Sequence, residues 1–312
     1  MYKHNIEKTK LESELRSKNS LLLKRVTYAS VFVACLLIVV KFVAWVGTDS
    51  VSILSSLADS FLDGIASIIN LIAVRHALSP ADQDHRFGHG KAEALSGLAQ
   101  STFIIGSVVF LLVEVVPRFF NPQSIENGSL GIGTSIFALV ITVGLVIYQK
   151  YVIRKTNSLA ISADSLHYVS DILLNVSVIV ALVLSIYLNW ILADVIFAVL
   201  IAFFILFSAA KIFRRSYDQL MDKEFPENER DLIKDIVLKH PDVLDIHDLR
   251  TRKSGYTNFI QFHLDLKSDI SLYEAHEISD QVEMQLLKIF PGSDVIIHQD
   301  PEGVDEFRAG FE

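Results

Sequence analysis

Two pairs of potential metal ligands, Asp59 with Asp63 and His167 with Asp171, lie inside long apolar stretches of the sequence. The members of each pair are one helical turn apart, so in a helix they project from one face, about 6 Å apart along the axis. A carboxylate at the centre of a bilayer costs roughly 2.5–3.5 kcal/mol, so these aspartates require compensation. Three carboxylates and one imidazole facing one another would form a ligand set suited to a tetrahedral divalent cation such as Zn²⁺.

The alternative for these pairs is a static arrangement in which they pair with buried cations or hydrogen-bond within a helix bundle. Lys41 is the candidate cation within an apolar stretch, and its long side chain is expected to snorkel to the interface. Four other polar residues in the apolar stretches are interpreted as interfacial or interhelical hydrogen-bonding groups: Asn70, Asp164, Asn175 and Asp194.

A second set of potential ligands lies in the polar connector 80–91. Asp82, His85 and His89 could offer three ligands to one cation, and two glycines in the same connector would let the loop fold around it. Spacing alone leaves a second interpretation open, namely a polar loop with two incidental histidines.

A third set lies in the last third of the chain. In the predicted strand 256–267, alternate apolar residues face a core, so His263 projects from the opposite face. One open sheet face could gather His247, His263, His298 and Asp300, and His276 could reach in from the helix that follows. Solvent-exposed histidines without metal remain the alternative. Three other histidines lack evident partners and are expected at the surface: His4, His76 and His240.

The hydropathy of the chain indicates a polytopic membrane protein. Its 312 residues are 51% hydrophobic, with a mean hydropathy of +0.40. Six apolar segments are long enough to span a bilayer: about 22–47, 51–78, 93–117, 129–149, 158–187 and 190–210. Lysine and arginine concentrate in the connectors after the second, fourth and sixth segments, so both termini are predicted to be cytoplasmic.

Cysteine content and charge exclude several classes of protein. The single cysteine, Cys35, excludes an intrachain disulfide and a multi-thiolate metal site. No cleavable signal is expected, because residues 1–20 are charged throughout. Residues 1–211 hold 14 acidic and 16 basic residues, whereas residues 212–312 hold 22 and 12. The acidic second part argues against nucleic-acid binding, which needs a basic surface.

Beyond residue 215 the pattern changes to a mixture of helices and strands. Residues 226–240 and 271–290 predict helices, and three segments predict strands: 243–253, 256–267 and 293–299. The order αββαβ predicts a ferredoxin-like α+β domain. The predicted organisation is a cytosolic N-terminal tail (1–21), a domain of six transmembrane helices (22–211), a cytosolic metal-binding α+β domain (212–300) and a flexible tail (301–312).

Five strings carry a resemblance to the cation diffusion facilitator family, in particular to its bacterial subgroup of zinc and ferrous-iron exporters: LADSFLDG (57–64), PADQDHRFGHGKAEAL (80–95), DSLHYVSDILLN (164–175), HDLRTRKSG (247–255) and FPGSDVIIHQDP (290–301). The resemblance extends from about residue 22 to residue 301. It implies a homodimer with six transmembrane helices per protomer, located in the bacterial cytoplasmic (inner) membrane. Such a protein exports divalent metal in exchange for protons.

Matched by position, the resemblance implies three metal sites. They are a transport site of Asp59, Asp63, His167 and Asp171, a loop site of Asp82, His85 and His89, and a cytosolic binuclear site of His247, His263, His298 and Asp300, with His276 and the backbone of Gln299 nearby. The resemblance also matches Lys91 and Asp222 to a charged pair that links the membrane domain to the cytosolic domain.

These observations predict proton-coupled efflux of Zn²⁺, with Cd²⁺ and Fe²⁺ as further candidate cargoes. Mg²⁺ and Ca²⁺ are expected to be poor cargoes because they demand six or more oxygen ligands. Zn²⁺ binds neutral histidine and ionised aspartate, so protons compete with the metal, and His167 is the predicted proton carrier. Zn²⁺ is also expected as a structural or regulatory ion on the cytosolic domain, and the sequence leaves that choice open.

Other classes of membrane protein fit parts of the sequence. An intramembrane metalloprotease would need an H-E-x-x-H helix, and none occurs, so no enzyme is predicted. A channel is disfavoured, because four convergent ligands would hold a divalent ion too long for fast conduction. A receptor that only senses metal could use the same ligands, and a flux measurement separates it from a transporter.

Overall fold

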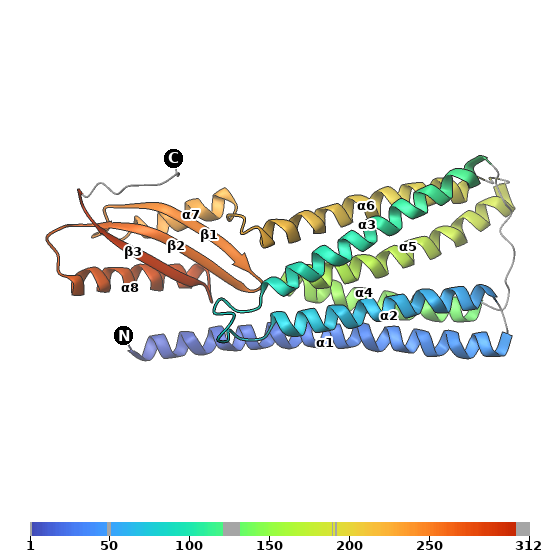
Figure 1. Cartoon of the computed structure of the whole chain (residues 1–312), viewed down its shortest axis with the longest axis horizontal. Coiled ribbons are helices and arrows are strands. Elements are labelled where there is room, and N and C mark those ends of the chain that lie inside the picture. The colour runs from blue at the N-terminus through green and yellow to red at the C-terminus, as the bar shows by residue number, and fades with distance from the viewer. Residues whose placement is uncertain (1, 49–50, 121–131, 189, 191, 304–312) are drawn as a thin grey trace. The chain divides into compact units, whose positions relative to one another are not determined.

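The computed structural model describes residues 2–48, 51–120, 132–188, 190 and 192–303 (Figure 1). The chain forms two compact units, one built from residues 16–217 and the other containing residues 218–303. The predicted tail beyond residue 303 lies outside the described residues.

The first unit is a bundle of long helices: α1 (Tyr2–Thr48, in this unit from Arg16), α2 (Val51–Ala77), α3 (Lys91–Phe120), α4 (Ile132–Thr156), α5 (Leu159–Leu188) and α6 (Ala193–Leu220, in this unit to Tyr217). All six are long and apolar enough to cross a membrane. The prediction of six transmembrane helices is thus confirmed, and the chain is a multi-pass membrane protein. Residues 129–131 and 191 of the predicted segments lie outside the described residues.

The first helix begins earlier than expected. Residues 1–21 are predicted as a tail, whereas α1 already begins at Tyr2. This stretch contains no glycine or proline, so nothing in it breaks the helix that continues into the apolar segment.

Helix α5 is the centre of the bundle and contacts α2, α3 and α4. Its first turns are fully buried at Ala160, Ile161 and Ala163. Large apolar side chains such as Phe110 and Phe207 point outward instead, as a surface in contact with lipid requires. The bundle therefore holds α5 against the helix that carries Asp59 and Asp63.

The second unit contains α7 (Glu227–Val237), β1 (Asp245–Ser254), β2 (Thr257–Leu266), α8 (Leu272–Ile289) and β3 (Asp294–Pro301). The strand order is β1-β2-β3, with β1 antiparallel and β3 parallel to β2. The predicted αββαβ order and α+β class are therefore confirmed (Figure 1).

One face of this sheet carries the core. Ile260, Phe262, Leu264 and Leu266 of β2 are buried against α7 and α8. His263 lies between two of these residues in sequence and stays half-buried on the other face, as the alternation predicts.

Helix α8 begins with a capping box. Ser271 Oγ accepts a hydrogen bond from the Glu274 backbone N–H, and the Glu274 carboxylate accepts one from the Ser271 backbone N–H. The hydrogen bond from the Ser271 backbone lowers the pKa of the Glu274 carboxyl.

Candidate metal centres

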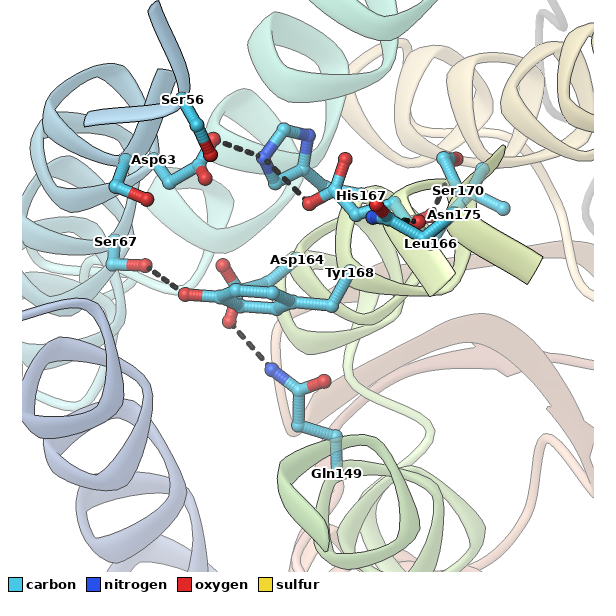
Figure 2. A network of polar contacts seen from close by, with 12 residues as sticks. Ser56, Asp63, Ser67, Gln149, Asp164, Leu166, His167, Tyr168, Ser170 and Asn175 are labelled. Carbon is cyan, nitrogen blue, oxygen red and sulfur yellow. Dashed lines mark hydrogen bonds and ion pairs between the residues drawn. The ribbon is translucent and has the colours of Figure 1, made fainter. Parts of the chain in front are cut away.

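Helices α2 and α5 bring three of the four predicted intramembrane ligands together. One ligand atom each from Asp63, His167 and Asp171 lies within 4.8 Å of the others. His167 Nε2 is 2.7 Å from Asp63 Oδ1 (Figure 2). The same nitrogen is 3.8 Å from Asp171 Oδ2. Ligand atoms on one tetrahedral Zn²⁺ are about 3.4 Å apart, since each lies about 2.1 Å from the metal. Small side-chain shifts would thus suffice to enclose an ion.

The ligands lie deep along both helices. Asp59 and Asp63 are about 12 and 18 Å along α2 from Val51, and His167 and Asp171 are the same distances along α5 from Leu159. If the two helices cross the bilayer in opposite directions, as their sequence order predicts, both pairs reach its middle.

Polar contacts cap the start of α5 and join α5 to α2 and α3. Ser158 Oγ accepts a hydrogen bond from Ile161 N, and the Glu93 carboxylate of α3 accepts one from Leu159 N. Farther along, the hydroxyls of Ser67 and Tyr168 hydrogen-bond at 3.0 Å (Figure 2). Ser67 is one turn beyond Asp63, so the two helices are joined at successive turns.

Asp59 is the predicted ligand that the structure does not place within this cluster. Its side chain is exposed, and it lines the same cavity of about 600 Å³ as Asp63, His167 and Asp171. The three clustered residues leave one position of a tetrahedral metal site open. Asp59 lines the cavity beside that open position.

Lys41, which is expected to snorkel to the interface, makes polar contacts with α2. Its ammonium group donates hydrogen bonds to Ser60 Oγ at 2.7 Å and to the Ser56 carbonyl oxygen at 3.0 Å, both on α2. Lys41 lines the cavity of the aspartates. The acceptors on α2 and the nearby carboxylates favour the cation at this place, and snorkelling to the interface stays a prediction.

Replacing Lys41 with methionine should tighten Zn²⁺ binding, on the order of tenfold, because the change removes a positive charge that competes with the metal for the same carboxylates. Calorimetric titration of the full chain in detergent measures this affinity. Lys41→Arg keeps the charge and is the matched control. Equal affinities for the methionine variant and the wild type would contradict the competing role.

The other polar residues of the spans behave differently from one another. Asn70 Oδ1 accepts a hydrogen bond from Ser96 of α3, and Asp164 accepts hydrogen bonds from Ser30 and Gln149, so the predicted interhelical role is confirmed for Asn70 and Asp164. Asn175 instead donates to the Asp171 carbonyl oxygen of its own helix. The side chain of Asp194 lies outside the described residues.

The connector between α2 and α3 gathers Asp82, His85 and His89, with one ligand atom of each within 4.8 Å of the others. Asp82 is 3.4 Å from His85 Nδ1 and 3.3 Å from His89 Nε2. The His85 backbone N–H donates to Asp82 Oδ1 at 2.7 Å and lowers the pKa of the Asp82 carboxyl. The loop thus holds an ionised carboxylate beside two imidazoles.

Two histidines expected to lack partners have them. The His76 ring lies against the His89 ring, with centroids 4.4 Å apart. His240 is buried, hydrogen-bonds Gln281 through Nε2 and accepts from the Asp242 N–H. His76 is nevertheless exposed, as expected, whereas the surface expectation is wrong for His240. The partners could not be predicted because they come from distant positions in the sequence or from a loop that folds back. The side chain of His4 lies outside the described residues.

A third cluster crosses the sheet of the second unit. His247, His263 and His298 face one another at matching positions of β1, β2 and β3. Asp300 is nearly buried, and its carboxylate lies 3.4, 2.7 and 3.1 Å from those three imidazoles in turn. Ring centroids of neighbouring histidines are 5.0 and 4.6 Å apart. The Asp300 carboxylate therefore lies close to all three histidines on the face of the sheet that the helices leave open.

Two further aspartates join this cluster. Asp265 Oδ1 is 3.3 Å from His247 Nδ1, and a ligand atom of Asp248 lies within 4.8 Å of His247 and His263. Strand alternation could have identified Asp265, which is two residues beyond His263. Asp248 could not be found in this way, because an irregularity in β1 and a positive φ at that residue direct it to the same face as its neighbour.

His276 is not among the clustered ligand atoms within one chain. It is exposed on α8, 3.7 Å from Asp280. The Gln299 side chain donates to Ser279 of α8, while the Gln299 backbone, which is the predicted contribution, lies between His298 and Asp300 of the cluster.

The predicted charged pair has its two members in different units. Lys91 begins α3, and the Asp222 carboxylate is 3.5 Å from the guanidinium of Arg252.

Comparison with known families gives two matches that together cover most of the chain. Residues 27–221 match the model for the cation efflux transmembrane domain. Residues 225–302 match the model for the cytoplasmic domain of cation efflux proteins.

Individual relatives match over nearly their full length. The chain is 50% identical over 282 residues to a cation-efflux pump FieF of Shewanella oneidensis. The matched residues make up 90% of this chain and 95% of the relative. A cation-efflux pump FieF of Salmonella paratyphi A is 47% identical over 280 residues, with coverage of 90% and 93%. The metal-bound C-terminal domain of the CzcD transporter from Thermotoga maritima is 28% identical and covers 26% of this chain and 100% of that domain, with a TM-score of 0.25.

Proposed function

Because this chain belongs to the cation efflux family of membrane transporters, the cation diffusion facilitators, we propose that it exports Zn²⁺ in exchange for protons. The observation that carries the proposal is the approach of Asp63 on α2 to His167 and Asp171 on α5, within the spans and beside a cavity. Cd²⁺ and Fe²⁺ are further proposed cargoes. Asp59 is proposed to complete the ligand set, because it borders that cavity.

Protons and metal compete for the same atoms in this site. Zn²⁺ needs the free electron pair of an imidazole nitrogen and ionised carboxylates, so its binding displaces protons and protonation weakens its binding. His167 Nε2 faces both carboxylates, so a proton held there is shared with Asp63 and replaces the metal. His167 is therefore the proposed proton carrier, with the aspartates sharing the role.

The ligand set also explains the proposed selectivity. One imidazole with carboxylates at tetrahedral spacing suits Zn²⁺ and Cd²⁺, whereas Mg²⁺ demands octahedral oxygen and Ca²⁺ takes six to eight oxygens. Mg²⁺ and Ca²⁺ are therefore proposed to pass poorly.

We propose that the chain works as a homodimer in the bacterial cytoplasmic membrane, with both termini in the cytoplasm. The cluster of His247, His263, His298 and Asp300 would bind Zn²⁺ there and stabilise or regulate the dimer. Its position on the sheet face opposite the helices leaves it accessible to a second copy. The charged pair of Lys91 and Asp222 remains a proposed link between membrane domain and cytosolic domain.

Flux into inverted proteoliposomes tests the proposed function. Zn²⁺ uptake should rise when the vesicle interior is made acidic and should be accompanied by proton release to the outside. Cd²⁺ should compete, whereas Mg²⁺ and Ca²⁺ in excess should not. Binding without uptake would identify a metal receptor instead, and uptake indifferent to the pH gradient would refute proton exchange.

A further inference from the structure

The last turn of α2 places a histidine beside the loop cluster of Asp82, His85 and His89. The His76 ring centroid is 4.4 Å from that of His89, and His85 lies on His89 at 4.7 Å. His89 is therefore the middle member of a row of three imidazoles.

His89 is buried, and its two ring nitrogens have different surroundings. Its side chain is only 6% exposed, and among the described residues its Nδ1 has no hydrogen-bond partner. The other nitrogen, Nε2, faces the Asp82 carboxylate at 3.3 Å, so Nε2 is the atom that an ion shared with Asp82 would meet. A buried imidazole directed at a carboxylate, with two further imidazoles beside it, indicates a place for a cation.

The separations of the three rings and of the Asp82 oxygens are close to those of a tetrahedral site. Two imidazoles on one tetrahedral Zn²⁺ have ring centroids about 5 Å apart, since each nitrogen lies about 2.1 Å from the metal. The two observed separations are slightly shorter. The Asp82 oxygens lie 3.4 and 3.3 Å from His85 and His89, close to the edge of such a tetrahedron.

The His76 nitrogens are not among the ligand atoms that lie within 4.8 Å of one another. His76 is exposed at the end of its helix, so its side chain can turn without disturbing the core. A rotation of the ring is therefore the step that would bring it into coordination.

We infer that His76 is a fourth ligand of the loop site and that Asp82, His76, His85 and His89 form a closed tetrahedral Zn²⁺ site. This inference rests on the proposed function only in taking the loop to bind a divalent metal. Four protein ligands leave no open position, as in structural zinc sites, so the ion would be held and not passed on.

The ion would connect two elements that the chain joins only through a loop. His76 belongs to α2, and His89 is two residues before the start of α3. A metal bound by both would fix the end of the helix that carries Asp59 and Asp63. The loop site would then be a clamp on α2.

The test uses the full chain in detergent with the other two clusters disabled by Asp63→Ala, Asp171→Ala, His263→Ala and Asp300→Ala. In this background His76→Gln should weaken Zn²⁺ and Co²⁺ binding at least about tenfold. It should also lower the intensity of the visible Co²⁺ absorption that marks tetrahedral coordination. Arg75→Gln, an adjacent exposed change, should leave both unchanged.

A second variant keeps the test decisive if His76→Gln disturbs folding. His76→Cys should give a thiolate-to-Co²⁺ charge-transfer band, because a thiolate at this position would enter the coordination sphere. No such band, together with Co²⁺ affinity and spectrum unchanged by His76→Gln, would overturn the inference. If His89→Ala abolishes binding in that case, the loop site stands and only the fourth ligand fails. If His89→Ala also has no effect, the proposed loop site itself fails.

Discussion

Replacing Asp63 with alanine is expected to abolish Zn²⁺ efflux. Within the clustered ligands, Asp63 is the contribution of α2, and its carboxylate is 2.7 Å from His167 Nε2. Losing a supporting residue around a bound metal typically costs 10–100-fold in affinity, so losing a ligand should cost at least about 100-fold. The change also leaves the metal without a clustered ligand from α2. Flux into proteoliposomes and calorimetric affinity measure the two effects.

Two variants control this prediction. Asp63→Asn keeps the volume and a hydrogen bond to His167 while removing the charge, and it should be almost as inactive. Ser67→Ala, one turn along α2, removes only the hydrogen bond with Tyr168 and should retain most of the flux. A wild-type rate in Asp63→Ala would show that the carboxylate is not a ligand of the cargo.

Replacing Asp300 with asparagine is expected to empty the cytosolic site while leaving the intramembrane site filled. The nearly buried carboxylate of Asp300 lies within 3.4 Å of three imidazoles, so its charge is the one shared by all of them. Without it the remaining carboxylates, Asp265 and Asp248, are grouped with His247 and not with His298. Metal content per chain, measured after desalting, should fall by the ions bound there, and the affinity of the intramembrane site should be unchanged.

The exposed Asp269 supplies the matched control, since Asp269→Asn removes the same charge from the same unit outside the cluster. It should keep the wild-type metal content. His276→Gln separates two versions of the site. Within one chain His276 lies apart from the cluster, so a loss of metal in this variant would mean that a second copy or a rearrangement brings His276 in. Full metal content in Asp300→Asn would contradict the assignment of that carboxylate.

The transport cluster could be predicted from the sequence because polar residues in an apolar stretch are few and their spacing fixes a helical face. Asp63, His167 and Asp171 meet as that reasoning requires. The position of Asp59 could not be predicted in the same way. Asp59 and Asp63 are about one helical turn apart, but four residues are slightly more than one turn, so their side chains point in somewhat different directions. The Asp59 side chain lines the adjoining cavity.

Contacts between residues of different elements could not be predicted where they depend on how the chain folds back. Lys41 contacts α2 because Ser56 and Ser60 accept its hydrogen bonds. His76 meets His89 because the connector folds back on the end of α2. In the sheet, strand alternation placed His263 correctly, whereas the irregularity in β1 that brings in Asp248 has no recognisable sequence pattern.

Asp63 and Asp171 are proposed to bind one divalent ion together with His167. Anomalous scattering from crystals of the full chain grown with Zn²⁺ tests it directly. A single zinc peak about 2.1 Å from His167 Nε2 and from one carboxylate oxygen of each aspartate is the predicted result. Zinc confined to the loop and the cytosolic cluster, in a protein that still transports it, would contradict the account.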